Sequence, residues 1–343
     1  MINRLKSALA RRARIVLGLC AGSAVLGYSG DWHWVPELLA HFFLVYWLTT
    51  LLCVAVLFWA GWRRSAWAAA ALLAAFSALL LPYFPWPQPT LKPAPELRLL
   101  QFNAAQQPEP VLGWLRQNAQ RLDVVVLLEA GPDFAPGLEK LRVQFPHQLT
   151  RLQAGPFGIA VLSRWPLQLA QVLEPAGPDF PALAATFAVP GWPAPVRLYA
   201  VHPPPPLGAA LADARNRFIA ALAQTVTQNP APALVVGDMN LTPWSPVFRQ
   251  FQTLTDLHDC QLGQGWQATW PSVTADVLPL FGLPIDACLH AAALRVQSRH
   301  VLDAMGSDHL LVLTVLAWDG NLTKSPDSGL PPAKMTDKIS FTR

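Results

Sequence analysis

The sequence is poor in cysteine and in charged residues. Four of its 343 residues are cysteine, and Asp, Glu, Lys and Arg together make up 13% of the chain. The cysteines form no Cys-x-x-Cys pair and no Cys/His spacing typical of zinc ligands, so a structural zinc site is not expected. Spacing leaves a disulfide between Cys260 and Cys288 open, and we favour two small buried thiols.

Residues 97–318 also lack a cluster of Lys and Arg. This segment holds 13 Lys and Arg against 15 Asp and Glu, a net charge of −2, although the whole chain carries +4. Binding of nucleic acid depends largely on a basic surface that neutralises phosphates. A nucleic-acid substrate is therefore disfavoured for this segment.

Residues 1–84, in contrast, contain three apolar stretches, Ile15–Gly30, Leu38–Gly61 and Ala66–Phe84, which predict helices at about residues 12–30, 36–61 and 65–84. The second and third satisfy the roughly 20 apolar residues that a bilayer span requires. The first follows a group of arginines and is either a short span or the apolar region of a cleaved signal peptide. We favour a span, because no A-x-A cleavage site closes the stretch. The sequence thus predicts a membrane anchor of three transmembrane helices.

The basic residues of the anchor predict its orientation. Five Lys and Arg residues precede the first stretch, and Arg63 and Arg64 separate the second from the third. The loop at 31–37 carries no Lys or Arg. The positive-inside rule then places the amino terminus and the Arg63-Arg64 turn in the cytoplasm, so that the third span exits outward. Residues 97–318 are expected outside the cytoplasm, whether or not the first stretch is cleaved.

The remainder of the chain divides into a linker, a globular domain and a tail. Residues 85–96 are rich in proline and predict an extended linker, and residues 319–343 are polar, aperiodic and expected to be disordered. Helical patterns occur at 111–118, 136–143 and 209–228. Strand-length apolar runs occur at 97–102, 124–128, 158–162, 196–201, 234–236, 285–289, 294–296 and 310–316. This mixture predicts an α/β fold of two packed sheets flanked by helices.

Polar residues repeatedly end the predicted strands of this domain. Asn103, Glu129, His202 and Asp238 each follow an apolar run, and Asp286 lies inside another. One polar strand end is routine, whereas several from separate strands indicate the rim of one site. Carboxylates, an amide and imidazoles can together hold a hard divalent cation and a phosphate ester and transfer protons.

The order of these motifs resembles the endonuclease/exonuclease/phosphatase superfamily across about residues 97–318. The matching segments are Gln101-Phe102-Asn103, Leu127-Leu128-Glu129-Ala130, the strand 158–163, Val201-His202-Pro203, Gly237-Asp238-Met239-Asn240, Ile285-Asp286 and Ser307-Asp308-His309. The resemblance implies a DNase I-like fold, a four-layer sandwich of two mixed β-sheets flanked by helices.

The proline run 203–206 and the three amino-terminal stretches are similar to a membrane-anchored bacterial branch of the superfamily, which includes teicoplanin-resistance-type proteins. This similarity implies a multi-pass protein of the bacterial inner membrane with a periplasmic or extracellular catalytic domain. Two positions depart from the family pattern, so the family's detailed substrate contacts are not carried over to this chain. Ala287 stands where relatives commonly carry Tyr or His, and no arginine precedes Ile285.

The resemblance implies hydrolysis of a phosphoester with a divalent cation, Mg²⁺ or Mn²⁺. Glu129, helped by Asn103 and Asp308, would hold the cation through oxygen ligands. Asp238 would orient or deprotonate the attacking water, and Asn240 would donate hydrogen bonds to a phosphate oxygen.

Two imidazoles complete the implied site. His309, paired with Asp286, would act as a base or a charge stabiliser, because a carboxylate on one ring nitrogen fixes the tautomer. His202 would face the leaving oxygen or the charge of the transition state. Four histidines match no motif and are expected at the surface or partly buried: His147, His258, His290 and His300.

These observations predict a membrane-anchored, metal-dependent phosphohydrolase. Its expected partners are the lipid bilayer and a phosphoester or pyrophosphate at the membrane surface, such as a lipid-linked carrier. One alternative is a metal-dependent endonuclease or exonuclease acting on DNA or RNA. Another is a catalytically inactive binding module of a membrane complex. The sequence gives no oligomeric state.

Overall fold

The computed structural model describes residues 1–85, 94–273, 278 and 281–319. Residues 86–93 of the predicted linker at 85–96 and residues 320–343 of the predicted tail at 319–343 lie outside the described residues.

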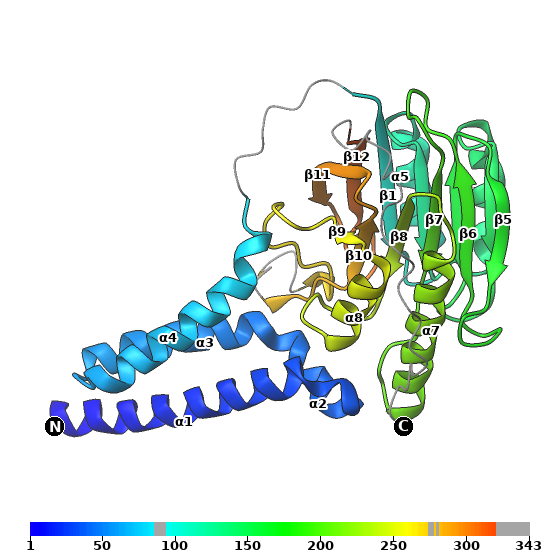
Figure 1. The fold of residues 1–343 in the computed structure, drawn as a ribbon. Coiled ribbons are helices and arrows are strands. Elements are labelled where there is room, and N and C mark those ends of the chain that lie inside the picture. The colour runs from blue at the N-terminus through cyan, green and yellow to red at the C-terminus, as the bar shows by residue number, and fades with distance from the viewer. Residues whose placement is uncertain (86–93, 274–277, 279–280, 320–343) are drawn as a thin grey trace, which may run out of the picture.

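Twelve strands of the described domain form two six-stranded mixed sheets (Figure 1). The first sheet has the order β11 (Leu294–Val301), β12 (Val312–Trp318), β1 (Glu96–Asn103), β2 (Val124–Leu128), β4 (Ile159–Ser163) and β3 (His147–Arg151). The second has the order β5 (Gln168–Leu173), β6 (Ala182–Phe187), β7 (Val196–Val201), β8 (Ala233–Asp238), β10 (Asp286–His290) and β9 (His258–Asp259). Two pairs are parallel, β1 with β2 and β7 with β8, and the other pairs are antiparallel.

The central strands are buried on both faces because alternate residues enter different cores. Val124, Val126 and Leu128 of β2 pack between the two sheets. Val125 and Leu127 face the opposite way, into the core beneath the flanking helices. The continuous Val/Leu run of β2 is therefore a strand covered on both sides.

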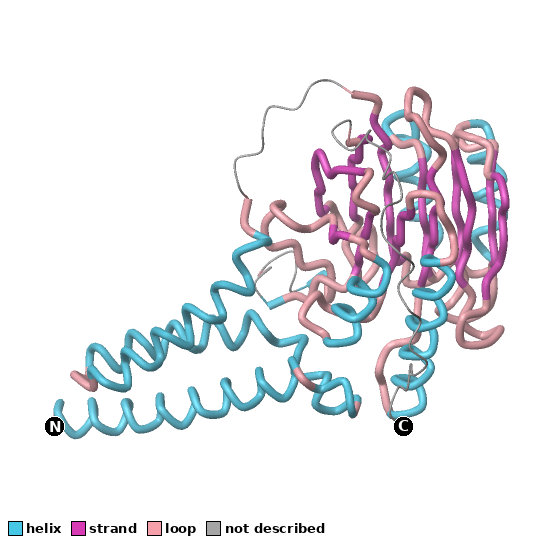
Figure 2. The backbone as a smooth tube through the Cα atoms, viewed as in Figure 1, coloured by secondary structure: helices cyan, strands magenta, loops and turns pink. Residues whose placement is uncertain are grey.

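Helices cover the outer face of each sheet (Figure 2). Residues of α5 (Pro108–Asn118) and α6 (Ala135–Lys140) pack on the first sheet, and residues of α7 (Ala209–Thr227) and α8 (Pro246–Thr255) pack on the second. The four layers are helix, sheet, sheet and helix. The predicted four-layer α/β sandwich is confirmed.

The two parallel pairs determine where the polar strand ends meet. In each pair a helix returns the chain, α5 between β1 and β2 and α7 between β7 and β8. Each crossover brings the carboxyl ends of its two strands to the same edge of the sheet. Since β1 and β2 of one sheet contact β8 of the other, both pairs end around one space between the sheets.

The predicted anchor consists of helices α1 (Ile2–Tyr28), α2 (Trp34–Leu38), α3 (Phe43–Trp59) and α4 (Arg63–Leu80), together with short 3-10 segments. The three long helices pack together and project from one side of the sandwich (Figure 1). Two described segments, Trp34–Trp59 and Arg63–Tyr83, have the length and composition to cross a membrane. The structure thus gives two candidate spans where the sequence predicted three, because the first half of α1 carries five Lys and Arg residues.

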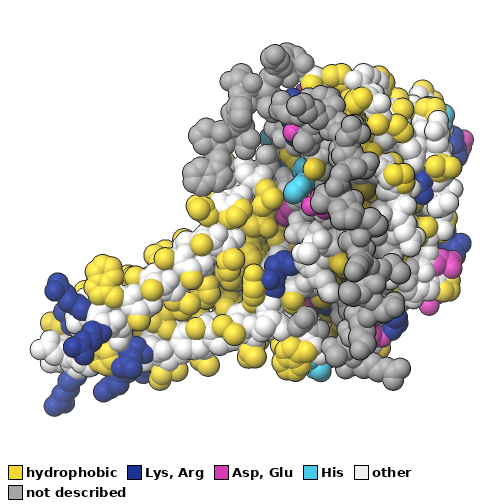
Figure 3. Space-filling view, in the orientation of Figure 1, with side chains coloured by type: hydrophobic (Ala, Val, Ile, Leu, Met, Phe, Trp, Pro, Cys, Tyr) yellow, Lys and Arg dark blue, Asp and Glu magenta, His cyan; other side chains and the backbone are white. Residues whose placement is uncertain are grey.

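Basic side chains gather at the end of the anchor that lies far from the sandwich (Figure 3). They come from the start of α1 and from the start of α4, and most are exposed: Arg4, Arg11, Arg12, Arg14, Arg63 and Arg64. Apolar side chains cover the visible length of the helices between this end and the domain. This is the distribution that the positive-inside rule associates with a cytoplasmic helix end.

Candidate active site

Gly237 allows β8 to end directly beside β7. Its φ is +149°, and a Cβ at this position would collide with the carbonyl oxygen of Val201, so only glycine permits the approach. The chain then presents Asp238, which is 2% exposed, toward the space between the sheets. Asn240 follows in the left-handed region at φ +51°, and its backbone N–H donates to Asp238 Oδ1 at 2.9 Å. The turn after β8 therefore fixes the carboxylate.

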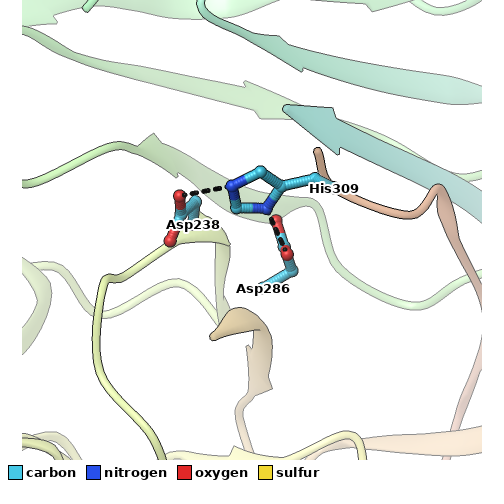
Figure 4. A group of neighbouring side chains, drawn as sticks. All are labelled: Asp238, Asp286 and His309. Carbon is cyan, nitrogen blue, oxygen red and sulfur yellow. Dashed lines mark hydrogen bonds and ion pairs between the residues drawn. The ribbon is translucent and has the colours of Figure 1, made fainter. Parts of the chain in front are cut away.

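His309 lies between two buried carboxylates (Figure 4). Its Nδ1 is 2.8 Å from Asp286 Oδ2, and its Nε2 is 3.5 Å from Asp238 Oδ2. Asp286 and Asp238 are directly opposite in the register of β10 and β8. The backbone N–H of His309 donates to Ser307 Oγ, which itself donates to the carbonyl oxygen of Asn103 at 2.7 Å. The imidazole is thus held from both sides and by its own backbone.

These contacts change the pKa values of the groups. Burial alone would lower the pKa of His309, but the carboxylates of Asp286 and Asp238 outweigh it and raise this pKa to about 10. Burial would raise the pKa of Asp238, but the imidazoles of His309 and His202 outweigh it and lower this pKa. At neutral pH His309 is therefore an imidazolium and Asp238 a carboxylate.

The raised pKa of His309 makes folding stability depend on pH. The stabilisation is complete below the ordinary histidine value of 6.5 and is lost as the pH rises toward about 10. For the metal-free protein, we expect the difference in Tm between the wild type and His309→Gln to shrink across this window. Thermal unfolding followed by circular dichroism in EDTA measures it, and a difference that stays constant with pH would contradict the assignment.

Asn103 lies at the centre of the described site. Its side chain is 1% exposed, and its Nδ2 donates to Glu129 Oε1 and to Asp238 Oδ2, each at 3.2 Å. The same nitrogen is 3.4 Å from His309 Nε2. The amide therefore joins the predicted metal-binding carboxylate to the predicted catalytic groups.

Glu129 follows β2 with a φ of +54°, an uncommon conformation for a non-glycine residue. Burial raises the pKa of its carboxyl group, and His202 and the hydrogen bond from Asn103 act in the opposite direction. A partly buried carboxylate with few donors around it has oxygen atoms left to bind a cation.

His202 and Asn240 lie on the side of β7. His202 is 3% exposed, its Nε2 is 3.5 Å from Asp238 Oδ2, and its ring lies 5.5 Å from that of Phe157. Asn240 Nδ2 donates to the carbonyl oxygen of Pro203 at 3.0 Å. Both residues stand beside Asp238.

Asp308 is the exposed member of the predicted metal ligands. Its side chain is exposed and its Oδ2 accepts a hydrogen bond from Trp270 Nε1 at 3.0 Å, whereas the next residue, His309, is buried. The Asp308 carboxylate nevertheless helps to raise the pKa of His309. Of the predicted set, the structure brings Asn103 and Glu129 into contact and turns Asp308 toward Trp270.

Several residues that support the site were missed by the sequence analysis. The backbone N–H of Asp286 donates to Thr269 Oγ1 at 3.3 Å, and Arg299 Nη2 donates to the carbonyl oxygen of Asp286 at 2.7 Å. Neither residue belongs to a motif, so no signal in the sequence could have found them. Cys260 and Cys288 are free, buried thiols with their Sγ atoms 2.7 Å apart.

The donor atoms of the described site suit a divalent cation. Asp238, Asp286 and His309 offer ligand atoms within 4.8 Å of one another, which makes them a candidate metal group. Both ring nitrogens of His309, however, already face carboxylates. Glu129 with Asn103 fits better, because a half-turn of the amide would present Oδ1 where Nδ2 now lies between two carboxylates.

Comparison with known proteins agrees with this geometry. The fold resembles solved structures described as an endonuclease/exonuclease/phosphatase from Beutenbergia cavernae (TM-score 0.51, 22% identity, 66% of this chain and 72% of that chain) and another from Bacteroides vulgatus (0.50, 16%, 65% and 99%). A third is D. rerio TDP2 complexed with a single-strand DNA product (0.52, 14%, 64% and 98%). At these identities, the similarity shows a shared DNase I-like fold.

A search of the curated proteins found no match to this chain. Residues 100–309, which span the strands and motifs that build the site, match the model of the Endonuclease/Exonuclease/phosphatase family. Members of this superfamily are typically phosphoester hydrolases and generally use divalent metals. The chain belongs to the Endonuclease/Exonuclease/phosphatase family.

Proposed function

We propose that this protein is a membrane-anchored hydrolase that uses Mg²⁺ or Mn²⁺ to cleave phosphoester or pyrophosphate bonds of a lipid-linked substrate outside the cytoplasm. The observation that carries the proposal is the buried contact of His309 with Asp238 and Asp286, beside Asn103 and Glu129. Burial of an imidazolium beside carboxyl groups has a desolvation cost, and groups with shifted pKa values gather at active sites.

The proposed roles follow from charge and geometry. Asp238, whose pKa is lowered, stays ionised and accepts a hydrogen bond from the attacking water. His309, whose pKa is raised, is a cation that stabilises negative charge developing on the phosphoryl oxygens. Of the two roles that the sequence analysis left open for His309, the structure supports the charge stabiliser.

The remaining groups bind and orient the substrate. His202 follows β7 of the second sheet, Asn103 ends β1 of the first sheet, and both approach Asp238 Oδ2. The imidazole of His202 can donate a hydrogen bond to the leaving oxygen. The amide of Asn240, which donates to the carbonyl oxygen of Pro203, lies beside the same strand ends. Glu129 and Asn103 would hold the cation, which neutralises phosphate charge when bound.

The membrane part of the proposal rests on the anchor. Two described segments could cross a bilayer, and the basic helix ends lie far from the sandwich (Figure 3). With these ends in the cytoplasm, the catalytic domain is outside the cytoplasm and close to the lipid surface. A phosphorylated group attached to a membrane lipid is the substrate that such a domain would meet most often.

The test is hydrolysis by the full-length protein purified in detergent. We expect release of phosphate, or of the phosphorylated product, from a lipid pyrophosphate when Mg²⁺ or Mn²⁺ is present, and none in excess EDTA. Hydrolysis rates across a panel of soluble phosphodiesters, phosphomonoesters and lipid pyrophosphates identify the class of substrate. Absence of metal-dependent hydrolysis across the panel would contradict the proposal.

A nuclease remains the second candidate, because the fold resembles a TDP2 that was solved with a single-strand DNA product. The net charge of −2 in residues 97–318 argues against it. Plasmid and single-stranded DNA belong in the same panel. Metal-dependent cleavage of DNA that falls steeply with salt, without hydrolysis of lipid pyrophosphate, would favour the nuclease.

A further inference from the structure

The segment that follows Asp238 is held at its far end by the membrane anchor. We call residues 239–245, between β8 and α8, the site loop. Its first residues belong to the site already described, and its last residue, Ser245, accepts from the N–H of Val247 as the N-cap of α8. Three of its residues, Thr242, Trp244 and Ser245, contact residues of the anchor.

Glu37 of α2 makes the first contact through a buried ionic network. Its side chain is 2% exposed, and its Oε2 accepts from Nη2 of Arg215 in α7 at 3.0 Å. Its Oε1 accepts from Ser245 Oγ at 2.6 Å. One anchor carboxylate therefore joins the catalytic domain's α7 to the end of the site loop.

His41 makes the second contact, four residues later. Its Nδ1 lies 3.0 Å from Thr242 Oγ1 and accepts the backbone N–H of Thr242 at 3.4 Å. A nitrogen that accepts an N–H carries no proton, so the proton of the neutral ring lies on Nε2, which faces Glu37 Oε1 at 3.6 Å. The contacts form a chain from Arg215 through Glu37 and His41 to Thr242.

Trp244 makes the third contact, with an aromatic stack. Its ring lies between those of Phe43, at 5.6 Å and 12°, and Trp266, at 5.3 Å and 17°. Tyr83, at the end of the second candidate span, lies 5.6 Å from it. Trp244 is 3% exposed, so the anchor covers a large apolar ring that the catalytic domain alone would leave open on that side.

The site loop is short and largely buried, so a displacement at one end of the loop is passed to the other end. Met239 and Leu241 are fully buried, and only Leu241 separates Asn240 from Thr242. Asn240 in turn donates to Asp238 Oδ1 and to the carbonyl oxygen of Pro203. A displacement of Thr242 would therefore reach the residue that orients the Asp238 carboxylate.

We infer that Glu37 and His41 are positioning residues, and that docking of the anchor sets the geometry of the active site through the site loop. The anchor then contributes to catalysis, in addition to attaching the domain to the membrane. The kinetic part of this inference rests on the proposed function, whereas the effect on the site loop does not.

The experiment compares variants of the full-length protein in detergent by two readouts. His41→Phe keeps a ring and removes Nδ1 without leaving a charge unpaired. We expect faster amide hydrogen exchange in the peptide that covers residues 239–245, and a kcat reduced about tenfold or more with little change in KM, since small misplacements of reacting groups cost rate. Arg215→Met should give the same pair of effects, because it removes the partner of Glu37.

The matched control is Arg217→Met, on the same helix as Arg215. Arg217 pairs with Asp213 at the surface and has no contact with the anchor among the described residues. We expect this variant to match the wild type in both readouts. Its side chain is 58% exposed, so the loss of its ion pair should cost little.

The outcomes separate this inference from the proposed function. Unchanged exchange of the site loop in His41→Phe, or equal changes in Arg217→Met, would overturn the inference. A kcat that stays at the wild-type value while the loop exchanges faster would also overturn it. If the wild type hydrolyses no substrate, the proposed function fails, and the exchange data alone decide whether the anchor holds the loop. If Arg215→Met does not fold, His41→Phe decides.

Discussion

Replacing Asp238 with alanine is expected to reduce metal-dependent phosphoester hydrolysis by roughly 10³-fold, the scale of a lost general base or water-orienting group. Asp238 is the residue on which the site converges, since Asn103, His202, Asn240 and His309 all contact its carboxylate. The loss should appear mainly in kcat, because the carboxylate acts on the water more than on the substrate.

Two further variants test whether the loss of activity comes from the charge of Asp238 and whether it is specific to this position. Asp238→Asn keeps the shape and removes the charge, so an equal loss assigns the effect to the charge. Asp303→Ala removes an exposed carboxylate in the same domain and should leave the rate unchanged. Steady-state rates at saturating Mg²⁺ measure all three. A rate for Asp238→Ala within a few-fold of the wild type would remove the proposed mechanism.

The site could be predicted because strand ends are visible in a sequence. Each of Asn103, Glu129, His202 and Asp238 follows a run of apolar residues that the two sheets bury. Parallel crossovers bring such ends to one edge, so residues distant in the chain become neighbours. Strand-length apolar runs such as that of β2, together with the helical spacing in α7, predicted two packed sheets flanked by helices, and the family resemblance implied the four-layer arrangement.

Other strands gave no clear signal. The sequence analysis missed β3, β5, β6 and β9 and the helix α8. β6 is Ala-Leu-Ala-Ala-Thr-Phe, and its alanines have little preference for strands, so it is a strand because β5 and β7 pair with it on both sides. β5 is largely exposed and lies at the edge of its sheet, where its pattern resembles a loop.

Tertiary contacts explain the remaining differences. In the motif Ser307-Asp308-His309 the imidazole is buried, whereas the Asp308 carboxylate is exposed and accepts a hydrogen bond from Trp270, a residue that belongs to no motif. The link between Glu37 and Arg215 spans 178 positions, and neither residue lies in a motif. Only the folded chain shows that the anchor touches the site loop.

His309→Ala is expected to lower kcat by roughly 10²- to 10⁴-fold, because it removes the cation that stabilises the transition state. The exposed His300→Ala is the matched control and should retain wild-type activity. Wild-type kcat in His309→Ala would contradict the role of this imidazole.

Asp286→Asn tests the cause of the charge and leaves the imidazole in place. Asp286 is the largest of the influences that raise the pKa of His309, so its neutral amide should lower that pKa toward the ordinary value of 6.5. Activity that requires the imidazolium should then fall at a lower pH in this variant than in the wild type. The alkaline limb of the pH profile of kcat measures the shift. If the limb stays in place while kcat falls at all pH values, Asp286 only orients the ring, and the charge on His309 must come from Asp238.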